Sequence, residues 1–454
     1  MGARSKAGDR LVLTPERLDL EGRGVADLEG EEFVVEGLLP GEQGEAVIEH
    51  VSRHARRSFA TLSGAPLQLS PDRTPRVCPA PCGGCAWQHL AYPAQLAHKR
   101  RRVEEALSAG VRVSDVVPAP ELVGYRNKAT YVIARPDDRL ALGAWAPRSH
   151  DWVDTSECRV VHPAIAGAAR AAAAALDRSG LEVYAEATRA GHLRYLVLRA
   201  SRSGDVLAGI VTTSDAPRPL LDAAAAGIAQ APGVRGVLWL PNDAATGAIL
   251  GAEAHALAGS PRIAESIGGI AVEVAIDTFL QVNLGAAEAL YQRLVGHLEP
   301  LGGRAAVDLY CGIGPIALML ARRGADVVGI ERNPAAIASA REAAARNGLA
   351  ARFDDAAAAG QVPRRVGDRP LDIAVVNPPR QGLSAELRAD LAAAGPPVLA
   401  YVSCGPESLG RDLAELAAGG YRLDAVEPFD LMPGTGHVET LVIARRGAQP
   451  GHPL

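Results

Sequence analysis

Aromatic residues and lysines are scarce in this chain. Phe, Trp and Tyr make up 4% of the 454 residues, and Lys6, Lys99 and Lys128 are the only lysines. The net charge of −5 excludes a generally basic surface of the kind that coats nucleic acid. No apolar run is long enough to span a membrane, and the first residues lack the apolar segment of a signal peptide. We therefore expect a cytoplasmic protein without a membrane partner, and a monomer is the default expectation.

Contact with RNA would have to rest on local basic patches. Two such patches are present, at residues 53–57 and 98–102, and each is rich in arginine. For either patch taken alone, a solvated arginine face is favoured over an RNA-binding surface.

Cysteines are few, and most of them are grouped. Cys78, Cys82 and Cys85 lie in one short loop, Cys158 lies further along, and only Cys311 and Cys404 remain of the six. In a reducing compartment such grouping indicates metal binding or catalysis rather than disulfides. The three thiols of this loop, together with Cys158, predict an iron–sulfur or zinc site.

The length and the local patterns predict three parts. Residues 1–68 alternate short apolar runs with glycine and charged turns, which is typical of a small β-barrel. Residues 69–280 contain the cysteine loop, a helical segment at 93–107 and a central α+β region. Residues 281–454 alternate strands and helices, which predicts a Rossmann-like, doubly wound parallel sheet and an α/β fold class.

In this last part the strands and helices have clear local signals. Strands are expected at 306–310, 326–330, 371–376 and 398–403. Asn333 is a good N-cap for a helix that begins at Pro334 and stops at Asn347-Gly348. The strand at 398–403 leads to Cys404, and a helix is expected from about Pro406.

A ligand site is expected at the carboxyl edge of this sheet. Gly312 and Gly314 follow the first strand and let the backbone approach a ligand at a helix N-terminus. Glu331 ends the second strand, where a carboxylate can accept hydrogen bonds from ribose hydroxyls. The glycines alone also fit a loose dinucleotide pattern. The turn Asn377-Pro378-Pro379-Arg380 after the third strand favours S-adenosylmethionine over a nicotinamide.

Cys404 is the candidate nucleophile. A thiol between a buried strand and a helix N-terminus lies near partial positive charge, which favours the thiolate. Cys311, by contrast, is explained by packing or by loop geometry. Neither Glu439 nor His437 would be singled out without Cys404, because a carboxylate at a strand end is usually solvated and a turn histidine is usually structural.

Several motifs occur together and in order along nearly the whole chain. In these motifs the sequence resembles the S-adenosylmethionine-dependent RNA uracil-5-methyltransferases that carry an N-terminal TRAM domain and an iron–sulfur cluster. The motifs that carry the resemblance are Gly37–Glu42, Cys82–His89, Tyr125–Lys128, Phe279–Asn283, Asp308–Gly312, Val402–Cys404 and Gly436–Thr440.

The resemblance implies a function and a set of roles. It implies that an RNA, either rRNA or tRNA, is methylated at C5 of a uridine, with Cys404 as the nucleophile and Glu439 as the base. It implies a [4Fe–4S] cluster on Cys78, Cys82, Cys85 and Cys158. Residues Gln281, Tyr310, Glu331 and Asn377, together with the loop of Gly312 and Gly314, would bind S-adenosylmethionine. Phe279 is a candidate stacking surface for a base that is flipped out of the RNA.

Two features depart from the family pattern. Three residues separate Cys78 from Cys82 where the family usually has five, so zinc is the alternative to the cluster. Asn377 stands where the family usually has Asp; an amide keeps an oxygen acceptor but loses the charge and gains a donor.

Two other functions stay open at this point. The Asn-Pro-Pro turn is also used by methyltransferases that act on amino groups, although an aromatic residue typically follows the prolines there and Arg380 follows here. The second alternative is a non-catalytic RNA-binding or redox-sensing protein in which the barrel and the cluster act.

Overall fold

The computed structural model describes residues 5–244, 249–251, 253–358, 362, 365–366 and 369–447. It divides into two compact units, which are described separately below. Unit 1 consists of Met1–Pro79, Gly83–Ala119 and Glu427–Glu439, and unit 2 of Ala80–Cys82, Pro120–Val426 and Thr440–Leu454. Within the described ranges, none of the helices has the length and apolar character needed to cross a bilayer.

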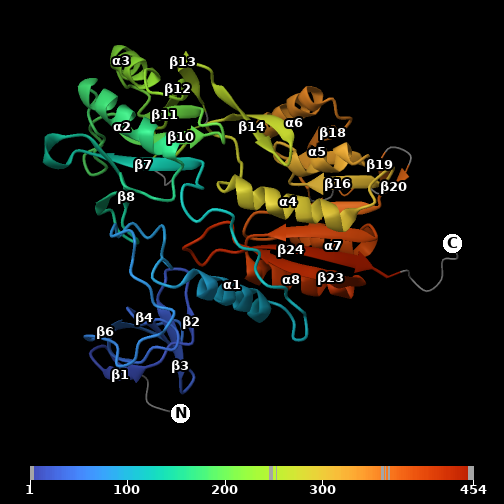
Figure 1. Cartoon of the computed structure of the whole chain (residues 1–454), viewed down its shortest axis with the longest axis horizontal. Coiled ribbons are helices and arrows are strands. Elements are labelled where there is room, and N and C mark those ends of the chain that lie inside the picture. The colour runs from blue at the N-terminus through green and yellow to red at the C-terminus, as the bar shows by residue number, and fades with distance from the viewer. Residues whose placement is uncertain are drawn as a thin grey trace. The chain divides into compact units, whose positions relative to one another are not determined.

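Unit 1 is built on a six-stranded half-barrel sheet. The order of its strands is β1-β5-β6-β4-β3-β2. Alternate side chains of these strands, among them Phe33, Val35 and Ile48, meet in a buried core. The bounds are β1 Arg10–Leu13, β2 Arg17–Leu18, β3 Gly24–Leu28, β4 Glu31–Glu36, β5 Gly44–Val51 and β6 Arg57–Leu62 (Figure 1). This sheet confirms the small β-barrel predicted from the glycine-punctuated sequence.

A second small core in unit 1 lies under helix α1 (Tyr92–Ala106). Trp87 is completely buried there among Leu18, Leu39, Leu90 and Ala94. The indole N–H donates to the carbonyl of Asp19 at 2.8 Å, which satisfies the one polar group of this side chain. The segment that follows the cysteine loop is therefore anchored by a large apolar side chain.

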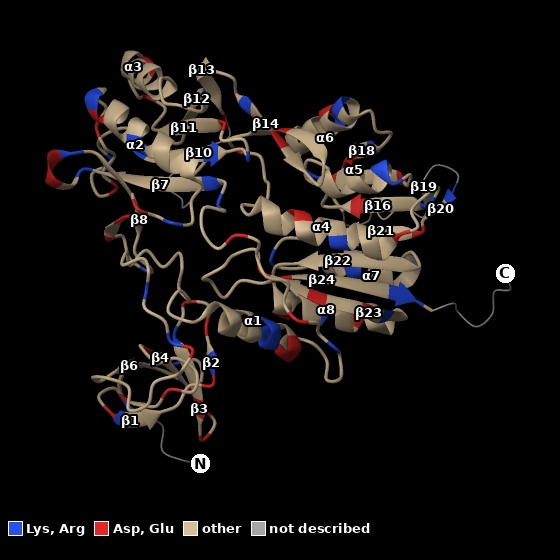
Figure 2. Ribbon diagram, viewed as in Figure 1, with Lys and Arg blue, Asp and Glu red and all other residues tan. Residues whose placement is uncertain are grey.

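Within unit 1, residues of both basic patches have acidic partners. Lys99 is fully buried, whereas Arg100 and Arg101 make exposed i,i+4 ion pairs with Glu104 and Glu105. Figure 2 shows basic and acidic segments next to each other along α1. In the first patch Arg57 pairs with Glu32. Arg100 and Arg101 are therefore partly exposed and neutralised by acids one turn further along α1, whereas Lys99 departs from the solvated surface that the sequence predicted.

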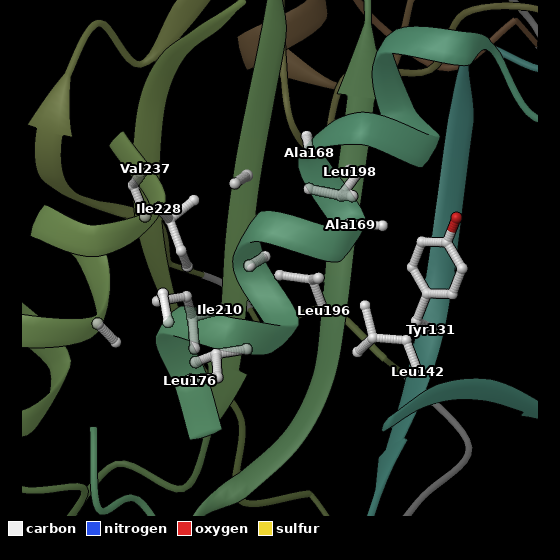
Figure 3. Close-up of a cluster of buried hydrophobic side chains, with 14 of the residues drawn as sticks. Tyr131, Leu142, Ala168, Ala169, Leu176, Leu196, Leu198, Ile210, Ile228 and Val237 are labelled. Carbon is white, nitrogen blue, oxygen red and sulfur yellow. The ribbon is translucent and has the colours of Figure 1, made fainter. Parts of the chain in front are cut away.

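The central part of unit 2 is a seven-stranded sheet with the order β13-β12-β11-β10-β7-β8-β9. Figure 3 shows α2 lying across β10 and β11, where Leu196, Leu198 and Ile210 meet Ala168 and Leu176 in the core. Small alanines on α2 allow close approach of the helix to the sheet. The bounds are β7 Lys128–Ala134, β8 Ala141–Trp145, β9 Trp152–Asp154, α2 Pro163–Arg178, β10 Leu193–Ala200, β11 Val206–Thr212, α3 Arg218–Ala229, β12 Val234–Pro241 and β13 His255–Gly259, with a 3-10 turn at Pro136–Asp138.

The C-terminal part of unit 2 is a second seven-stranded sheet, preceded by the hairpin of β14 (Arg262–Ile267) and β15 (Ile270–Ala275) and flanked by helices (Figure 1). Its order is β18-β17-β16-β21-β22-β24-β23, in which β24 runs antiparallel to β22. The bounds are α4 Leu284–Leu298, β16 Ala305–Leu309, α5 Pro315–Arg322, β17 Asp326–Glu331, α6 Pro334–Asn347, β18 Arg352–Asp355, β21 Ile373–Val376, α7 Ala385–Ala394, β22 Val398–Ser403, α8 Pro406–Ala418, β23 Tyr421–Phe429 and β24 Glu439–Arg446, with a small pair at β19 Arg365–Val366 and β20 Arg369–Pro370.

The topology of this sheet fixes where a ligand can bind. The first strand, β16, has β17 on one side and β21 on the other, and all three are parallel. The chain therefore leaves β16 and β21 in opposite directions, and in open α/β sheets ligands bind at the carboxyl ends of the strands beside such a switch point. The α/β fold with a Rossmann-like C-terminal part is confirmed, as are the Asn333 cap and the Gly348 stop of α6.

Candidate functional site

The loop after β16 has an unusual backbone. Tyr310, Gly312 and Gly314 all have positive φ, of 63°, 55° and 82°. Such a conformation is uncommon for a tyrosine and is retained only where the surroundings hold it. The Cys311 N–H donates to the carbonyl of Ile330 at 3.1 Å, so the loop is tied to the end of β17. The strained turn thus presents its backbone at the carboxyl edge of the sheet.

The two glycines of this loop serve different purposes. A Cβ added to Gly312 would meet nothing within 4 Å, so its backbone borders open space that a ligand can approach. A Cβ on Gly314 would lie 2.8 Å from the Phe353 ring, and one on Gly329 would lie 2.9 Å from the sulfur of Cys311. Gly314 is therefore required for packing, and the buried Cys311 is part of that packing, as the sequence indicated.

Glu331 links this loop to the start of α6. One carboxylate oxygen accepts the Gly312 N–H at 3.3 Å, and the other accepts the Asn333 N–H at 2.9 Å. The side chain is only half-buried. It holds the glycine loop and keeps lone pairs for a ligand, because a carboxylate has about four acceptor sites.

Asp308 is a buried acid to which sequence reasoning gave no role. It lies on β16 and accepts the Ala317 N–H of α5 at 3.0 Å through Oδ2, while its Oδ1 is buried without a hydrogen-bond partner among the described residues. Burial, together with the nearby charge of Glu331, raises the pKa of Asp308 to about 7, although the Ala317 hydrogen bond acts to lower it. The signal available in the sequence was an acid inside an otherwise apolar strand.

This raised pKa predicts a pH-dependent stability. The folded state holds a proton on Asp308 between pH 4 and 7 that the unfolded chain has released, so this contribution to stability falls as pH rises from 4 to 7 and levels off above 7. The loss amounts to at most about 4 kcal/mol. Asp308→Asn keeps an acceptor for Ala317 but cannot ionise. We expect the stability of the variant relative to the wild type to be about 4 kcal/mol greater at pH 8.5 than at pH 4, measured by calorimetric melting. Parallel curves across this range would contradict the assignment.

The Asn377 turn lies beside the glycine loop. The Asn377 N–H donates to the carbonyl of Leu309, the last residue of β16, at 3.4 Å. The turn is joined in the other direction to α8, because the Ser408 hydroxyl donates to the Arg380 carbonyl at 2.9 Å. The loops that follow β16 and β21 therefore lie next to each other at the carboxyl edge of the sheet.

Cys404 directly follows β22 and precedes Gly405, the N-cap of α8. Its side chain is half-buried. The Gly405 N–H donates to Ser403 Oγ at 3.2 Å, and a Cβ on Gly405 would lie 3.0 Å from the Arg380 carbonyl oxygen. The thiol thus lies at the start of a helix, where the N-terminal dipole favours negative charge, and next to the Asn377 turn.

Asp412 is a second buried acid that sequence reasoning missed. It is completely buried on α8 and accepts the Leu383 N–H at 2.7 Å and the Tyr401 hydroxyl at 2.8 Å. Arg411 pairs with it at 2.6 Å. These bonds join α8, β22 and the chain that follows the Asn377 turn, so both loops of the edge are held by one carboxylate. Its place between Leu409 and Leu413 on the buried face of α8 was the only signal in the sequence.

Gln281 lies in a segment that packs against the start of β7. The Asn127 side-chain amide donates to the Gln281 carbonyl at 3.0 Å, and the Asn127 N–H donates to the Val282 carbonyl at 2.9 Å. Asn283 then caps α4. Phe279 in the same segment is 74% exposed, a large value for an aromatic ring. This exposed ring is available for stacking.

Glu439 is the first residue of β24. The pairing of β22 with β24 ends at Ser403 with Thr440, which is one residue before Cys404 and one residue after Glu439. His437 lies in the preceding turn, where its N–H donates to the Thr435 hydroxyl at 3.2 Å.

The four cysteines that are predicted to bind a metal, Cys78, Cys82, Cys85 and Cys158, are half-buried thiols. Cys78 is held by Gln88, whose side-chain amide makes two hydrogen bonds of 2.9 Å with the Cys78 backbone. Cys158 packs against the core of the central sheet. Thiols suit an iron–sulfur cluster or zinc, but within the described ranges no three or more His, Cys, Asp or Glu side chains are arranged to hold a metal ion. The metal site therefore stays a prediction.

Comparison with known proteins places the chain in a family. A family model described as "Methyltransferase small domain" matches residues 286–394. An uncharacterized RNA methyltransferase of Thermosynechococcus vestitus is 33% identical over 96% of this chain and 98% of its own length. One of Geobacter sulfurreducens is 34% identical over 97% of this chain and 91% of its own length.

A solved structure resembles nearly the whole chain. It is the Pyrococcus abyssi tRNA (uracil-54, C5)-methyltransferase in complex with S-adenosyl-L-homocysteine, with a TM-score of 0.76 and 28% identity, covering 96% of this chain and 100% of that chain. The matched proteins are methyltransferases, and the glycine loop at the carboxyl edge of a parallel sheet in this chain suits the same kind of ligand site. The chain therefore belongs to the S-adenosylmethionine-dependent RNA methyltransferases.

Proposed function

We propose that this enzyme methylates C5 of a uridine in rRNA or tRNA through a covalent adduct between Cys404 and C6 of the uracil ring. The observation that carries the proposal is the position of the Cys404 thiol. It follows β22 at the same sheet edge as the glycine loop and the Asn377 turn, and Ser408 and Arg380 join its loop to that turn. Methyl transfer to an amino group needs no thiol at this place. The likeness to the Pyrococcus abyssi uracil-54 enzyme supports the same reaction class.

The chemistry requires both a nucleophile and a base. Uracil C5 is too weak a nucleophile to take a methyl group directly. Addition of the Cys404 thiolate to C6 forms an S–C bond and gives an enolate, whose C5 attacks the methyl group of the sulfonium donor and releases S-adenosylhomocysteine. Glu439 then removes the C5 proton, and the electron pair restores the C5–C6 double bond as the thiolate leaves.

The remaining residues would bind and orient. Glu331 would accept hydrogen bonds from the ribose hydroxyls, and the backbone at Gly312 would lie against the ligand, supported by Tyr310, Gln281 and Asn377. Gly314 would act through packing of the loop. Phe279 would stack on a base exposed from the RNA.

We also propose that Cys78, Cys82, Cys85 and Cys158 bind a [4Fe–4S] cluster, with zinc as the alternative. Bound there, the group would cross-link segments that are distant in sequence, and the proposed reaction needs no electron from it. The N-terminal half-barrel would serve as a TRAM-type RNA-binding domain.

Tritium release tests the reaction class. Transfer to C5 expels the C5 hydrogen, so RNA that contains [5-³H]uridine should release one tritium for each methyl group incorporated from S-adenosylmethionine. Methylation of an amino group would incorporate methyl without releasing tritium. A non-catalytic RNA-binding protein would do neither. Transcripts of rRNA and tRNA from the source organism, assayed side by side, would identify the substrate.

Removal of the Glu331 carboxylate should weaken cofactor binding. In the wild type the Glu331 carboxylate accepts the Gly312 N–H and, in the proposed complex, charge-assisted hydrogen bonds from the ribose. Glu331→Ala loses both, so we expect the dissociation constant of S-adenosylmethionine to rise about 10- to 100-fold. Calorimetric titration measures this directly. Glu342→Ala is the matched control, because Glu342 is an exposed acid on α6 that pairs with Arg262. Equal affinity in the two variants would contradict the ribose-binding role.

A further inference from the structure

The turn that precedes Glu439 is fastened to α1 by a buried ion pair. We propose that Lys99 and Asp430 are positioning residues for this turn, which we call the base turn (residues 430–437), and that they control proton removal and product release rather than formation of the bond to Cys404. The inference rests on the proposed function of Glu439. All contacts that carry it lie within unit 1.

Lys99 and Asp430 are both completely buried. The Lys99 ammonium donates to Asp430 Oδ1 at 2.6 Å and to the Met432 carbonyl at 3.1 Å, and the Met432 N–H donates to the same Oδ1 at 3.0 Å. Burial lowers the pKa of Lys99, and the Asp430 charge opposes this. A buried pair of this kind adds little net stability against an apolar substitute, but it fixes geometry where several donors meet one acceptor. Here it fixes the first residues of the base turn.

The same face of α1 holds the rest of the base turn. Gln95, one helical turn before Lys99, accepts the Gly434 N–H at 2.9 Å and donates to the carbonyls of Trp87 and Leu90 at 3.1 and 2.8 Å. Arg102, one turn after Lys99, donates to the Gly436 carbonyl. The side chains at positions 95, 99 and 102 therefore bind the base turn at successive points.

Trp87 also contacts the base turn. Its backbone N–H donates to the Gly434 carbonyl at 2.8 Å, and a Cβ on Gly436 would lie 2.8 Å from the Trp87 ring. The base turn is thus bonded at residues 430, 432, 434 and 436, directly before Glu439. Such repeated fastening is what a general base requires, because its oxygen must reach one C–H bond within a fraction of an ångström.

The consequence is selective for one half of the reaction. Addition of Cys404 and methyl transfer involve residues of unit 2, whereas the base acts only after the methyl group has moved. A shifted base turn should therefore leave adduct formation intact and let the methylated adduct accumulate. A pair that only stabilised the fold would lower both halves together.

The experiment follows both halves in the full-length enzyme. Lys99→Met removes the ammonium and both of its hydrogen bonds while nearly keeping the length of the side chain. We expect the rate of adduct formation with 5-fluorouridine RNA to stay within about threefold of the wild type, and the release of methylated product from uridine RNA to slow by about 10- to 100-fold. Denaturing gels with ³H-methyl label measure the ratio of adduct to released product. Asp430→Asn keeps the Oδ1 acceptor and should have a smaller effect on the same ratio.

Val103→Ala is the matched control, because Val103 is fully buried on α1 and its apolar side chain makes no hydrogen bond to the base turn. It should lower thermal stability without changing the ratio of adduct to product. An unchanged ratio in Lys99→Met, or an equal change in Val103→Ala, would overturn the inference. If Lys99→Met does not fold, Asp430→Asn decides by the same ratio. A wild-type enzyme that forms no adduct would overturn the proposed function and this inference with it.

Discussion

Cys404→Ala should form no covalent complex with 5-fluorouridine RNA and should lose methyl transfer by a factor on the order of 10⁴ or more. In the wild type the fluorine at C5 cannot be removed by a base, so the Cys404–C6 bond persists and the complex survives denaturation. Without the thiol there is no route to a nucleophilic C5. The complex is measured as a shifted band that carries both protein and RNA.

The chain offers a matched control for this prediction. Cys311 is a buried thiol in the same unit, and burial raises its pKa, so it is not available as a thiolate. Cys311→Ala should keep the covalent complex even where its glycine loop is disturbed. Calorimetric titration should show that Cys404→Ala still binds S-adenosylmethionine. Full methyl transfer by Cys404→Ala would favour the amino-group alternative. Loss of the covalent complex in Cys311→Ala but not in Cys404→Ala would show that Cys311, and not Cys404, is the nucleophile.

Local signals explain why much of the C-terminal sheet could be predicted. The helix at Pro334–Asn347 carries an N-cap, a first-turn proline and a stopping glycine, all within its own segment. The strand before Cys404 is a continuous apolar run, as parallel strands buried on both faces require. The carboxyl edge followed from the order of these elements, and so did the expectation that Gly312, Glu331 and Asn377 share it.

Long-range partners explain what the sequence could not predict. Lys99 lies in a run of basic residues that indicates a solvated surface, but its partner Asp430 is 331 residues away and makes it a buried residue. Asp412 is one more acid on an amphipathic helix until Tyr401 and Leu383 are seen to bind it. Gly312 and Gly314 look equivalent in a motif, and only the position of Phe353 separates the ligand-facing glycine from the packing glycine.

Glu439→Gln should stop the reaction after methyl transfer. The amide keeps nearly the same size and can still lie at the start of β24, but it cannot take the C5 proton. We expect uridine RNA to become methylated on the enzyme and to stay attached, with turnover reduced by about 10²- to 10⁴-fold, the range of general-base catalysis. Label from S-adenosyl-[methyl-³H]methionine should therefore move with the protein–RNA complex in a denaturing gel.

The number of methyl groups incorporated per enzyme gives a second measure of this trapped species. One methyl group per enzyme should be incorporated in a single burst, and release of tritium from [5-³H]uridine RNA should fall with turnover instead of matching the burst. Glu427→Gln is a useful comparison, because Glu427 is a buried acid at the end of β23 that lies outside the base turn, and it should show no burst. If Glu439→Gln instead fails to form any adduct, the carboxylate acts before methyl transfer, and the base must be sought among other groups of the site.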